Sequence, residues 1–285
     1  MSINKQYYIC ADSADLYAWI IRNKNFLFDR NKDYSRTVKI PFNNQVVDLI
    51  FVHKFSNRKK YDSLTKNFLS KTAGTPDYIL FSEDSENPIL CIEDSKTAPV
   101  GNSVIQRLDK LWPLMISTEI KCPVVYIGPK KGLDASNKQM RGWEQSWFYK
   151  SIAKDIPEVF RLLDDVNQDV CEESFLLITE IISKNLAGEQ IQKTQITKEM
   201  LSAMNKSMEK HVRTYNKNIF SGKLFQRSGV DAHPAQSTLL LITETRKTLG
   251  LPSATLQITE THKQKLLKSK TRRLKRILNN GVNFQ

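Results

Sequence analysis

Several residue types and patterns are scarce in this chain of 285 residues. It has four cysteines and four histidines, with no CxxC, HxH or HxxxH spacing, so neither a disulfide framework nor a zinc site is indicated. No apolar run approaches the roughly 18 residues that a membrane span needs. Acids at Asp12 and Asp15 interrupt the N-terminal stretch that a signal peptide would keep apolar. We therefore expect a soluble, cytoplasmic protein with no membrane segment, whose cysteines are reduced core residues.

Acidic residues are scarce in the last third of the chain. The net charge is +13, and residues 201–285 hold 16 bases against 4 acids, whereas residues 151–200 hold 5 bases against 10 acids. A basic segment of this kind favours a polyanionic partner. Nucleic acid is the expected partner because each neutralised phosphate releases a counterion. A basic surface that faces only solvent is the alternative.

Apolar periodicity predicts an α/β (or α+β) chain with a mixed sheet. In the first half of the chain, short predicted strands alternate with predicted helices, and the second half is mainly helical. We expect a catalytic core at residues 1–150 and a helical, basic region at 151–285, with a loose boundary and a single fused domain as the alternative. Strands are expected at 46–52, 77–81, 89–96 and 123–127, helices at 12–22, 104–111, 172–186, 237–249, 261–278 and from Thr197, and a loop at 221–236.

Three charged side chains fall at the ends of two neighbouring predicted strands. Asp77 opens the first strand, and Asp94 and Lys96 close the second after a polar turn at residues 82–88. Side chains alternate between faces along a strand, so Asp94 and Lys96 point to the same side. A hairpin brings the start of one strand beside the end of the next. Asp77, Asp94 and Lys96 are therefore expected to meet at one edge of a sheet.

Two carboxylates and an ammonium group suit metal-assisted hydrolysis of a phosphodiester. Mg²⁺ binds few protein carboxylates and keeps waters and phosphate oxygens as its other ligands. The metal acidifies a bound water and neutralises charge on the scissile phosphate. Lys96 would orient or deprotonate that water, because we expect a desolvated site beside a metal to depress the pKa of a lysine.

The motif Pro76-Asp77 followed by Asp94-Ser95-Lys96 resembles the PD-(D/E)XK nuclease superfamily. The similarity covers residues 74–112 and continues through Thr97, Gly101-Asn102 and Gln106-Arg107. It implies a restriction-endonuclease-like mixed sheet flanked by helices. It also implies that Asp77 and Asp94 hold the metal, that Lys96 is the catalytic lysine and that Gln106 has an accessory role. Glu93 is a further accessory candidate, although a regular strand directs it to the opposite face.

Other assignments of the acids remain open. Glu119-Ile-Lys121 is a second acid-x-Lys triplet, but it precedes its strand and has no Pro-Asp partner. Many nucleases of this superfamily use one more acid, for which Asp12, Asp15 and Asp48 are available. The alternative without catalysis is that these residues are surface acids and a solvated lysine, which can match the same sequence motif.

The resemblance implies a type II restriction endonuclease that uses Mg²⁺, or Mn²⁺ in its place, to cut double-stranded DNA at a short site. A homodimer would present one site to each strand of a palindrome, and a DNA methyltransferase is expected in the same cell. A repair or structure-specific nuclease and a non-catalytic DNA-binding protein are the alternatives. Candidate DNA-binding residues are Lys223, Gln226 and Arg227 in the loop and Lys268, Arg272 and Arg276 on the last helix.

Overall fold

A computed structural model gives the arrangement of the chain in space. It describes residues 4–30, 35–42, 45–70, 72, 74–96, 102–130, 132–133, 139–140, 146–164, 169–219, 232–256, 260–268 and 271–284. Within these ranges, no helix is both long enough and apolar enough to cross a membrane.

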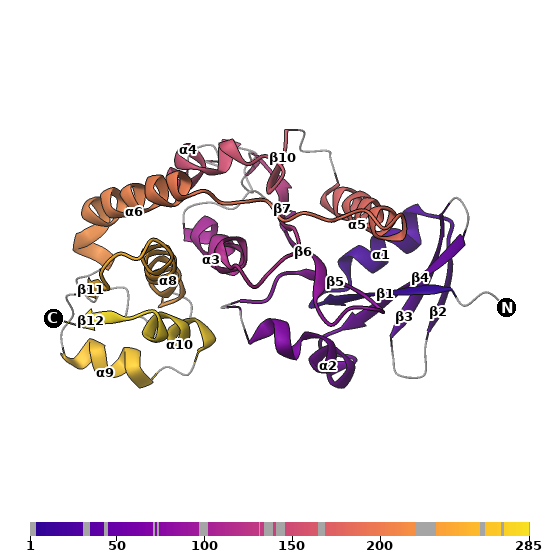
Figure 1. Ribbon diagram of the computed structural model, residues 1–285, viewed down its shortest axis with the longest axis horizontal. Helices are drawn as coiled ribbons and strands as arrows, with labels where there is room; N and C mark the ends of the chain where they lie inside the picture. The colour runs from indigo at the N-terminus through magenta and orange to yellow at the C-terminus, as the bar shows by residue number, and fades with distance from the viewer. Residues whose placement is uncertain are drawn as a thin grey trace.

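A mixed sheet of eight strands forms the centre of the molecule (Figure 1). Neighbouring strands β6, β7 and β10 are parallel, and so are β1 and β4, whereas β5 runs antiparallel to both β1 and β6. Two further antiparallel pairs, β4–β3 and β3–β2, complete the sheet. In spatial order the strands are β10 (Phe160–Leu163), β7 (Val124–Pro129), β6 (Pro88–Asp94), β5 (Tyr78–Ser82), β1 (Lys5–Ala11), β4 (Gln45–His53), β3 (Arg36–Phe42) and β2 (Leu27–Arg30).

Helices cover both faces of this sheet, so the chain is an α/β protein with a mixed central sheet. One face packs against α1 (Asp15–Asn23) and α5 (Val170–Leu186). On the opposite face α2 (Arg58–Leu69) and α3 (Asn102–Ile116) pack against the strands. The same buried cluster continues through α4 (Trp147–Ser151), α6 (Lys198–Ile219) and α8 (Ala232–Thr248), of which α8 packs on α3 and α6 packs on α4 and α8. The smaller elements are β8 (Gly132–Leu133), β9 (Gln139–Met140), η2 (Ala153–Asp155), β11 (Ala254–Leu256), α9 (Glu260–Lys268), α10 (Arg272–Asn279) and β12 (Val282–Phe284).

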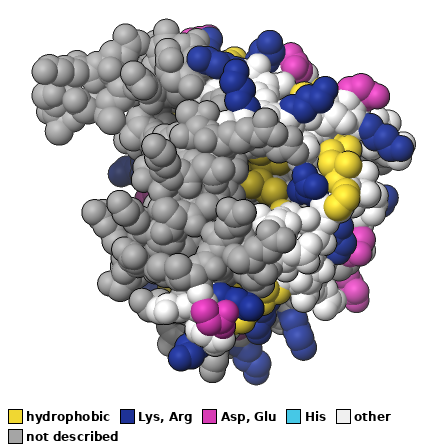
Figure 2. All heavy atoms as spheres, turned by 90° about the vertical axis from the view of Figure 1, so that its left-hand side faces the viewer, with side chains coloured by type: hydrophobic (Ala, Val, Ile, Leu, Met, Phe, Trp, Pro, Cys, Tyr) yellow, Lys and Arg dark blue, Asp and Glu magenta, His cyan; other side chains and the backbone are white. Residues whose placement is uncertain are grey.

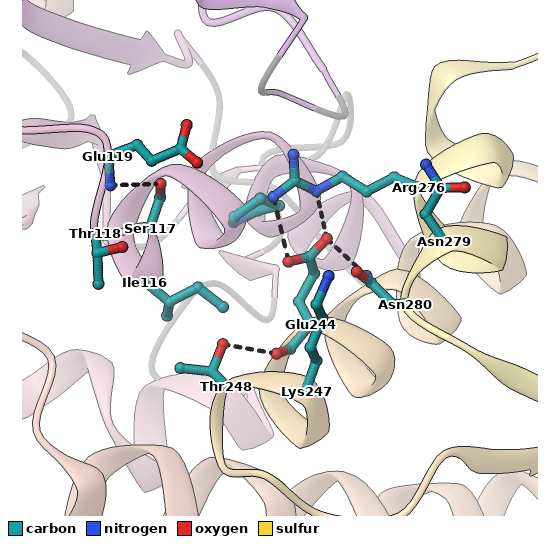
Figure 3. A pocket seen from close by; sticks show the side chains of 11 residues that line it. Ile116, Ser117, Thr118, Glu119, Glu244, Lys247, Thr248, Arg276, Asn279 and Asn280 are labelled. Atoms are coloured by element: carbon teal, nitrogen blue, oxygen red, sulfur yellow. Dashed lines mark hydrogen bonds and ion pairs between the residues drawn. The ribbon is translucent and has the colours of Figure 1, made fainter.

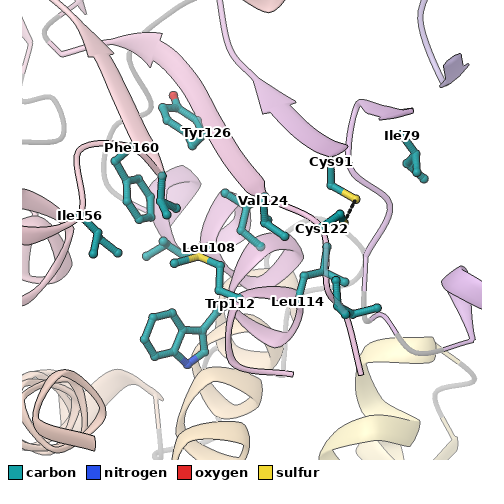
Figure 4. Packing of buried hydrophobic residues seen from close by; sticks show 14 of the residues in the cluster. Ile79, Cys91, Leu108, Trp112, Leu114, Cys122, Val124, Tyr126, Ile156 and Phe160 are labelled. Atoms are coloured by element: carbon teal, nitrogen blue, oxygen red, sulfur yellow. Dashed lines mark hydrogen bonds between the residues drawn. The ribbon is translucent and has the colours of Figure 1, made fainter. Parts of the chain in front are cut away.

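The core on the α3 side is built around aromatic side chains (Figure 4). Trp112 is fully buried and meets Phe148 edge to face, with ring centroids 5.6 Å apart. Phe148 in turn contacts Phe160 of β10 at 5.3 Å. The indole Nε1 of Trp112 donates a 2.9 Å hydrogen bond to Thr245 Oγ1 of α8, which satisfies its polar atom within the core. This pairing fixes α8 against α3.

Most of the predicted strands and helices are confirmed, including the antiparallel pairing of β5 with β6. Two predictions are wrong. The helix expected at 261–278 is two helices, because Thr271 caps a new helix by accepting a hydrogen bond from the Leu274 N–H. Residues 232–236 of the expected loop begin α8 instead, and the remainder of that loop, 221–231, lies outside the described residues.

Residues on both sides of position 150 build the same sheet. Strand β10 extends the sheet beyond β7, and α5 covers one of its faces. The C-terminal helix α10 is tied to the rest by buried ion pairs. Arg273 contacts the Asp109 carboxylate of α3, and Arg276 contacts Glu244 of α8, which also accepts a 2.8 Å hydrogen bond from Asn280 (Figure 3). A division near residue 150 would therefore cut through the sheet and its packing.

The Arg273–Asp109 pair predicts a large dependence of stability on the C-terminal helix. Asp109 is fully buried and Arg273 is 14% exposed, so Arg273→Ala leaves a buried carboxylate without its cation. We expect a loss of about 3–5 kcal/mol in the free energy of unfolding, measured by urea denaturation. Lys275→Ala, which removes an exposed charge from the same helix, should change it by less than about 0.5 kcal/mol. Equal effects of the two changes would contradict the structural role of the ion pair.

Candidate active site

Three acids lie side by side where β1, β5 and β6 meet. Ala11 pairs with Tyr78, and Tyr78 pairs with Ile92. Because β5 is antiparallel to both neighbours, the residue before Tyr78 lies opposite the residues after Ala11 and Ile92. This register places Asp77 between Asp12 and Glu93. Residues opposite one another on neighbouring strands point to the same face. The acids Asp12, Asp77 and Glu93 therefore form a row, here called the acid row, on the face covered by α3.

Glu93 is the most deeply buried member of the acid row, with no exposed surface. Its carboxylate contacts Arg107, and Lys110 Nζ donates to its two oxygens at 2.8 and 2.9 Å. Arg107 and Lys110 are three residues apart on α3 and so share one face of that helix. Even so, burial and the neighbouring Asp77 raise the pKa of Glu93 to about 8. The site thus holds this carboxylate at a high energetic cost.

Asp77 connects the acid row to the end of β6. Its carboxylate lies 3.5 Å from Lys110 Nζ and 3.6 Å from the Arg107 guanidinium. Asp77 Oδ2 also accepts a 3.0 Å hydrogen bond from the Asp94 backbone N–H. Gly74 makes this arrangement possible, because a Cβ atom there would lie 2.7 Å from Lys110 Cγ. Asp77 is therefore fixed by α3 on one side and by β6 on the other.

Asp94 and Lys96 lie on the opposite face, toward α1. Burial and Asp77 raise the pKa of Asp94 to about 7, although a hydrogen bond from Tyr78 opposes the shift. Lys96 Nζ lies 3.2 Å from Asp15 of α1, and its side chain is 64% exposed. This contact raises the pKa of Lys96. The expected depression of the lysine pKa is therefore wrong in this arrangement, since Lys96 is exposed and paired rather than desolvated.

The acids at this site outnumber the cationic side chains that contact them. A bound divalent cation would neutralise this excess negative charge. Burial and Asp77 also raise the pKa of Asp12, so three carboxylates around Asp77 resist ionisation together. In the described part of the chain, no three Asp, Glu, His or Cys side chains converge as a complete metal-binding group. Two carboxylates nevertheless suit Mg²⁺, which retains several waters. Of the acids expected to hold the metal, Asp77 lies in the acid row beside Asp12, whereas Asp94 lies on the opposite face and contacts Asp77 through its backbone N–H.

The candidate DNA-binding residues fall into three groups: one is exposed without a described role, two have contacts within the chain, and three lie outside the described residues. Lys268 is exposed on α9. Arg272 is exposed but donates to Leu69 and Thr75, and the partly buried Arg276 pairs with Glu244, so both of these side chains have contacts within the chain. Lys223, Gln226 and Arg227, together with the Gln106 side chain, lie outside the described residues.

Lys and Arg side chains are spread over the described part of the face shown in Figure 2, with some Asp and Glu side chains among them. This face includes helices of the basic last third of the chain. The rival triplet is placed differently from the acid row, because Glu119 and Lys121 are exposed where α3 leads to β7. Asp94, by contrast, contacts Asp77 of the acid row through its backbone N–H.

Sequence reasoning gave Asp12 no particular weight and omitted Lys110. The signal for Asp12 is the register of β1 against β5, which needs β1 to be recognised as a strand. The signal for Lys110 is its spacing of three residues from Arg107 on one helix. Neither signal identifies the facing strand without the tertiary structure.

Comparisons of the chain with protein-family models, curated proteins and solved structures gave no match. The candidate site therefore depends on its own geometry.

The crowded carboxylates predict a pH-dependent effect of neutralising Asp77. A carboxyl whose pKa is raised on folding stabilises the fold at low pH, and this contribution is lost as the pH rises through about 7 for Asp94 and about 8 for Glu93. Asp77→Asn lowers both pKa values, so its melting temperature relative to wild type should rise between pH 5.5 and 8.5. We expect a difference of about 1–2 kcal/mol, or a few degrees, in thermal melts with chelator.

The control for this experiment is Asp62→Asn, which neutralises an exposed acid of α2. Its melting temperature relative to wild type should be nearly independent of pH. If the Asp77→Asn difference is as flat as this control, the carboxylates do not repel one another as the geometry indicates.

Proposed function

We propose that the chain is a Mg²⁺-dependent endonuclease that hydrolyses phosphodiester bonds of double-stranded DNA, with a restriction-endonuclease-like fold. The observation that supports this most directly is the hydrogen bond from the Asp94 N–H to the Asp77 carboxylate. It joins the Asp77 side chain to the backbone of Asp94 at one end of β6, in a mixed sheet that carries helices on both faces. The two carboxylates lie on opposite faces, yet they are close enough for the charge of Asp77 to raise the pKa of Asp94. The basic C-terminal third suits a phosphate backbone.

Each site residue has a distinct part in this proposal. Asp77 and Asp94 would hold Mg²⁺, which when bound acidifies a water and neutralises charge on the phosphate. Lys96, kept protonated by Asp15, would act as a cation that orients the phosphate or the water rather than as a base. Arg107 and Lys110 fix Asp77 and Glu93 in place.

The biological role that we propose is a type II restriction endonuclease acting as a homodimer, with a DNA methyltransferase in the same cell. A repair nuclease with the same chemistry is the second candidate, because nothing in the acid row distinguishes the two. Digestion of long DNA separates them: discrete bands indicate a specific site, whereas progressive degradation or cutting only at branches indicates repair.

Replacement of the motif residues should abolish cleavage without unfolding the protein. Asp77→Ala and Asp94→Ala remove metal ligands, and Lys96→Ala removes a cation that acts near the reacting phosphate. We expect each variant to cleave plasmid DNA at least about a hundredfold more slowly than wild type. Glu119→Ala and Lys121→Ala should retain wild-type rates. Loss of cleavage in Glu119→Ala with retention in Asp94→Ala would mean that the other triplet is the catalytic one.

The metal requirement gives a separate prediction. Mg²⁺ or Mn²⁺ should support cleavage, and Ca²⁺ should support DNA binding without efficient cleavage, because Ca²⁺ binds loosely and acidifies its water less. Cleavage and gel-shift assays with each metal measure the two effects. Efficient cleavage in chelator would exclude this mechanism, and so would a complete lack of cleavage with every divalent metal.

A further inference from the structure

The first residue of α10, Arg272, bridges two segments that are far from it in the sequence. Its Nη1 donates to the Leu69 carbonyl oxygen at 3.2 Å, and its Nη2 donates to Thr75 Oγ1 at 3.1 Å. The planar guanidinium presents these donors in a fixed fork, which a lysine cannot reproduce. Arg272 thereby holds the end of α2 and the segment before β5 at a set separation.

The segment that Arg272 holds leads directly into the candidate active site. Thr75 is two residues before Asp77 and is 9% exposed. Its neighbour Gly74 lies against Lys110, which contacts Asp77. The path of the chain from Thr75 to Asp77 is short, so a shift of Thr75 moves the carboxylate that accepts the Asp94 N–H.

The next residue of α10 reaches the other side of the same site. Arg273 contacts Asp109, which precedes Lys110 on α3. Asp109 also accepts a hydrogen bond from Ser237 of α8. Two successive arginines of α10 therefore hold the strand segment that carries Asp77 and the helix that carries its cations.

We propose that Arg272 is a positioning residue for Asp77, through which the C-terminal region sets the geometry of the active site. This inference rests on the proposed nuclease function and replaces a phosphate contact as the role of Arg272. Its guanidinium is directed at two protein acceptors from different elements, and the acceptor next to the site is a nearly buried hydroxyl. The basic C-terminal helix is then part of the catalytic unit rather than a separate DNA-binding module.

The experiment compares Arg272→Ala and Arg272→Lys with Lys275→Ala, which removes an exposed charge from the same helix. DNA affinity is measured in Ca²⁺ over a range of salt, and the cleavage rate in Mg²⁺ at saturating plasmid DNA. Arg272→Ala should lower this rate at least about tenfold while affinity stays within about twofold. Arg272→Lys retains the charge but not the fork, so it should not restore the rate. Lys275→Ala should cleave at the wild-type rate.

Two further measurements separate positioning from a general loss of stability. Thr75→Val removes the hydroxyl that Arg272 bonds, so the double variant with Arg272→Ala should cleave no more slowly than Arg272→Ala alone. Hydrogen exchange of the Asp94 amide reports the contact with Asp77 without reference to activity. This amide should exchange faster in Arg272→Ala than in Lys275→Ala by at least about tenfold.

The possible results have distinct meanings. A drop in affinity and a flatter salt dependence for Arg272→Ala, with an unchanged rate at saturation and recovery in Arg272→Lys, would identify a phosphate contact and overturn the inference. A wild-type protein that cleaves, together with an Arg272→Ala variant that cleaves equally well, would overturn it and leave the nuclease function intact. If the wild type fails to cleave with any metal, the proposed function fails. In that case an unchanged Asp94 exchange rate overturns the positioning role as well.

Discussion

Burial of the Glu93 carboxylate is the constraint on which the arrangement of the site depends. A fully buried charge needs close partners, and both of its partners come from one face of α3. This requirement fixes the rotation of α3 over the sheet. It also requires Gly74 to lie close to Lys110, where a larger residue would collide. The position of Asp77 follows, because the same two cations contact it.

The two cations do not satisfy all the acids, and this imbalance is what makes the region a candidate for metal chemistry. Asp12, Glu93 and Asp94 have raised pKa values that share burial and Asp77 as their two leading causes. Groups with shifted pKa values concentrate at functional sites because such sites keep charge that is unfavourable for folding. Glu93 is paired with Lys110 and Arg107, but burial and the charge of Asp77 still raise its pKa. Here the fold retains these acids at one end of β6.

The basic last third of the chain serves two different purposes. Some of its arginines, such as Arg273 and Arg276, lie in ion pairs with buried acids of α3 and α8. Others, such as Lys268, remain exposed. A count of charges treats these groups alike, but only the exposed group can meet a polyanion without first breaking an internal contact. The net charge of the segment therefore overstates its free positive surface.

The sequence by itself determined the strands β5 and β6, their hairpin and the acids at their ends, because alternation and turn composition are local properties. It also determined that Asp94 and Lys96 share a face, since the period of a strand is two. Only the tertiary structure decided that Asp12 lies beside Asp77, because the register of β1 against β5 joins residues far apart in the chain. Likewise, only the packing of α10 directs Arg272 to Thr75, and only the position of α1 gives Lys96 its partner Asp15. Contacts of this kind depend on where whole elements come to rest, and no local pattern records that.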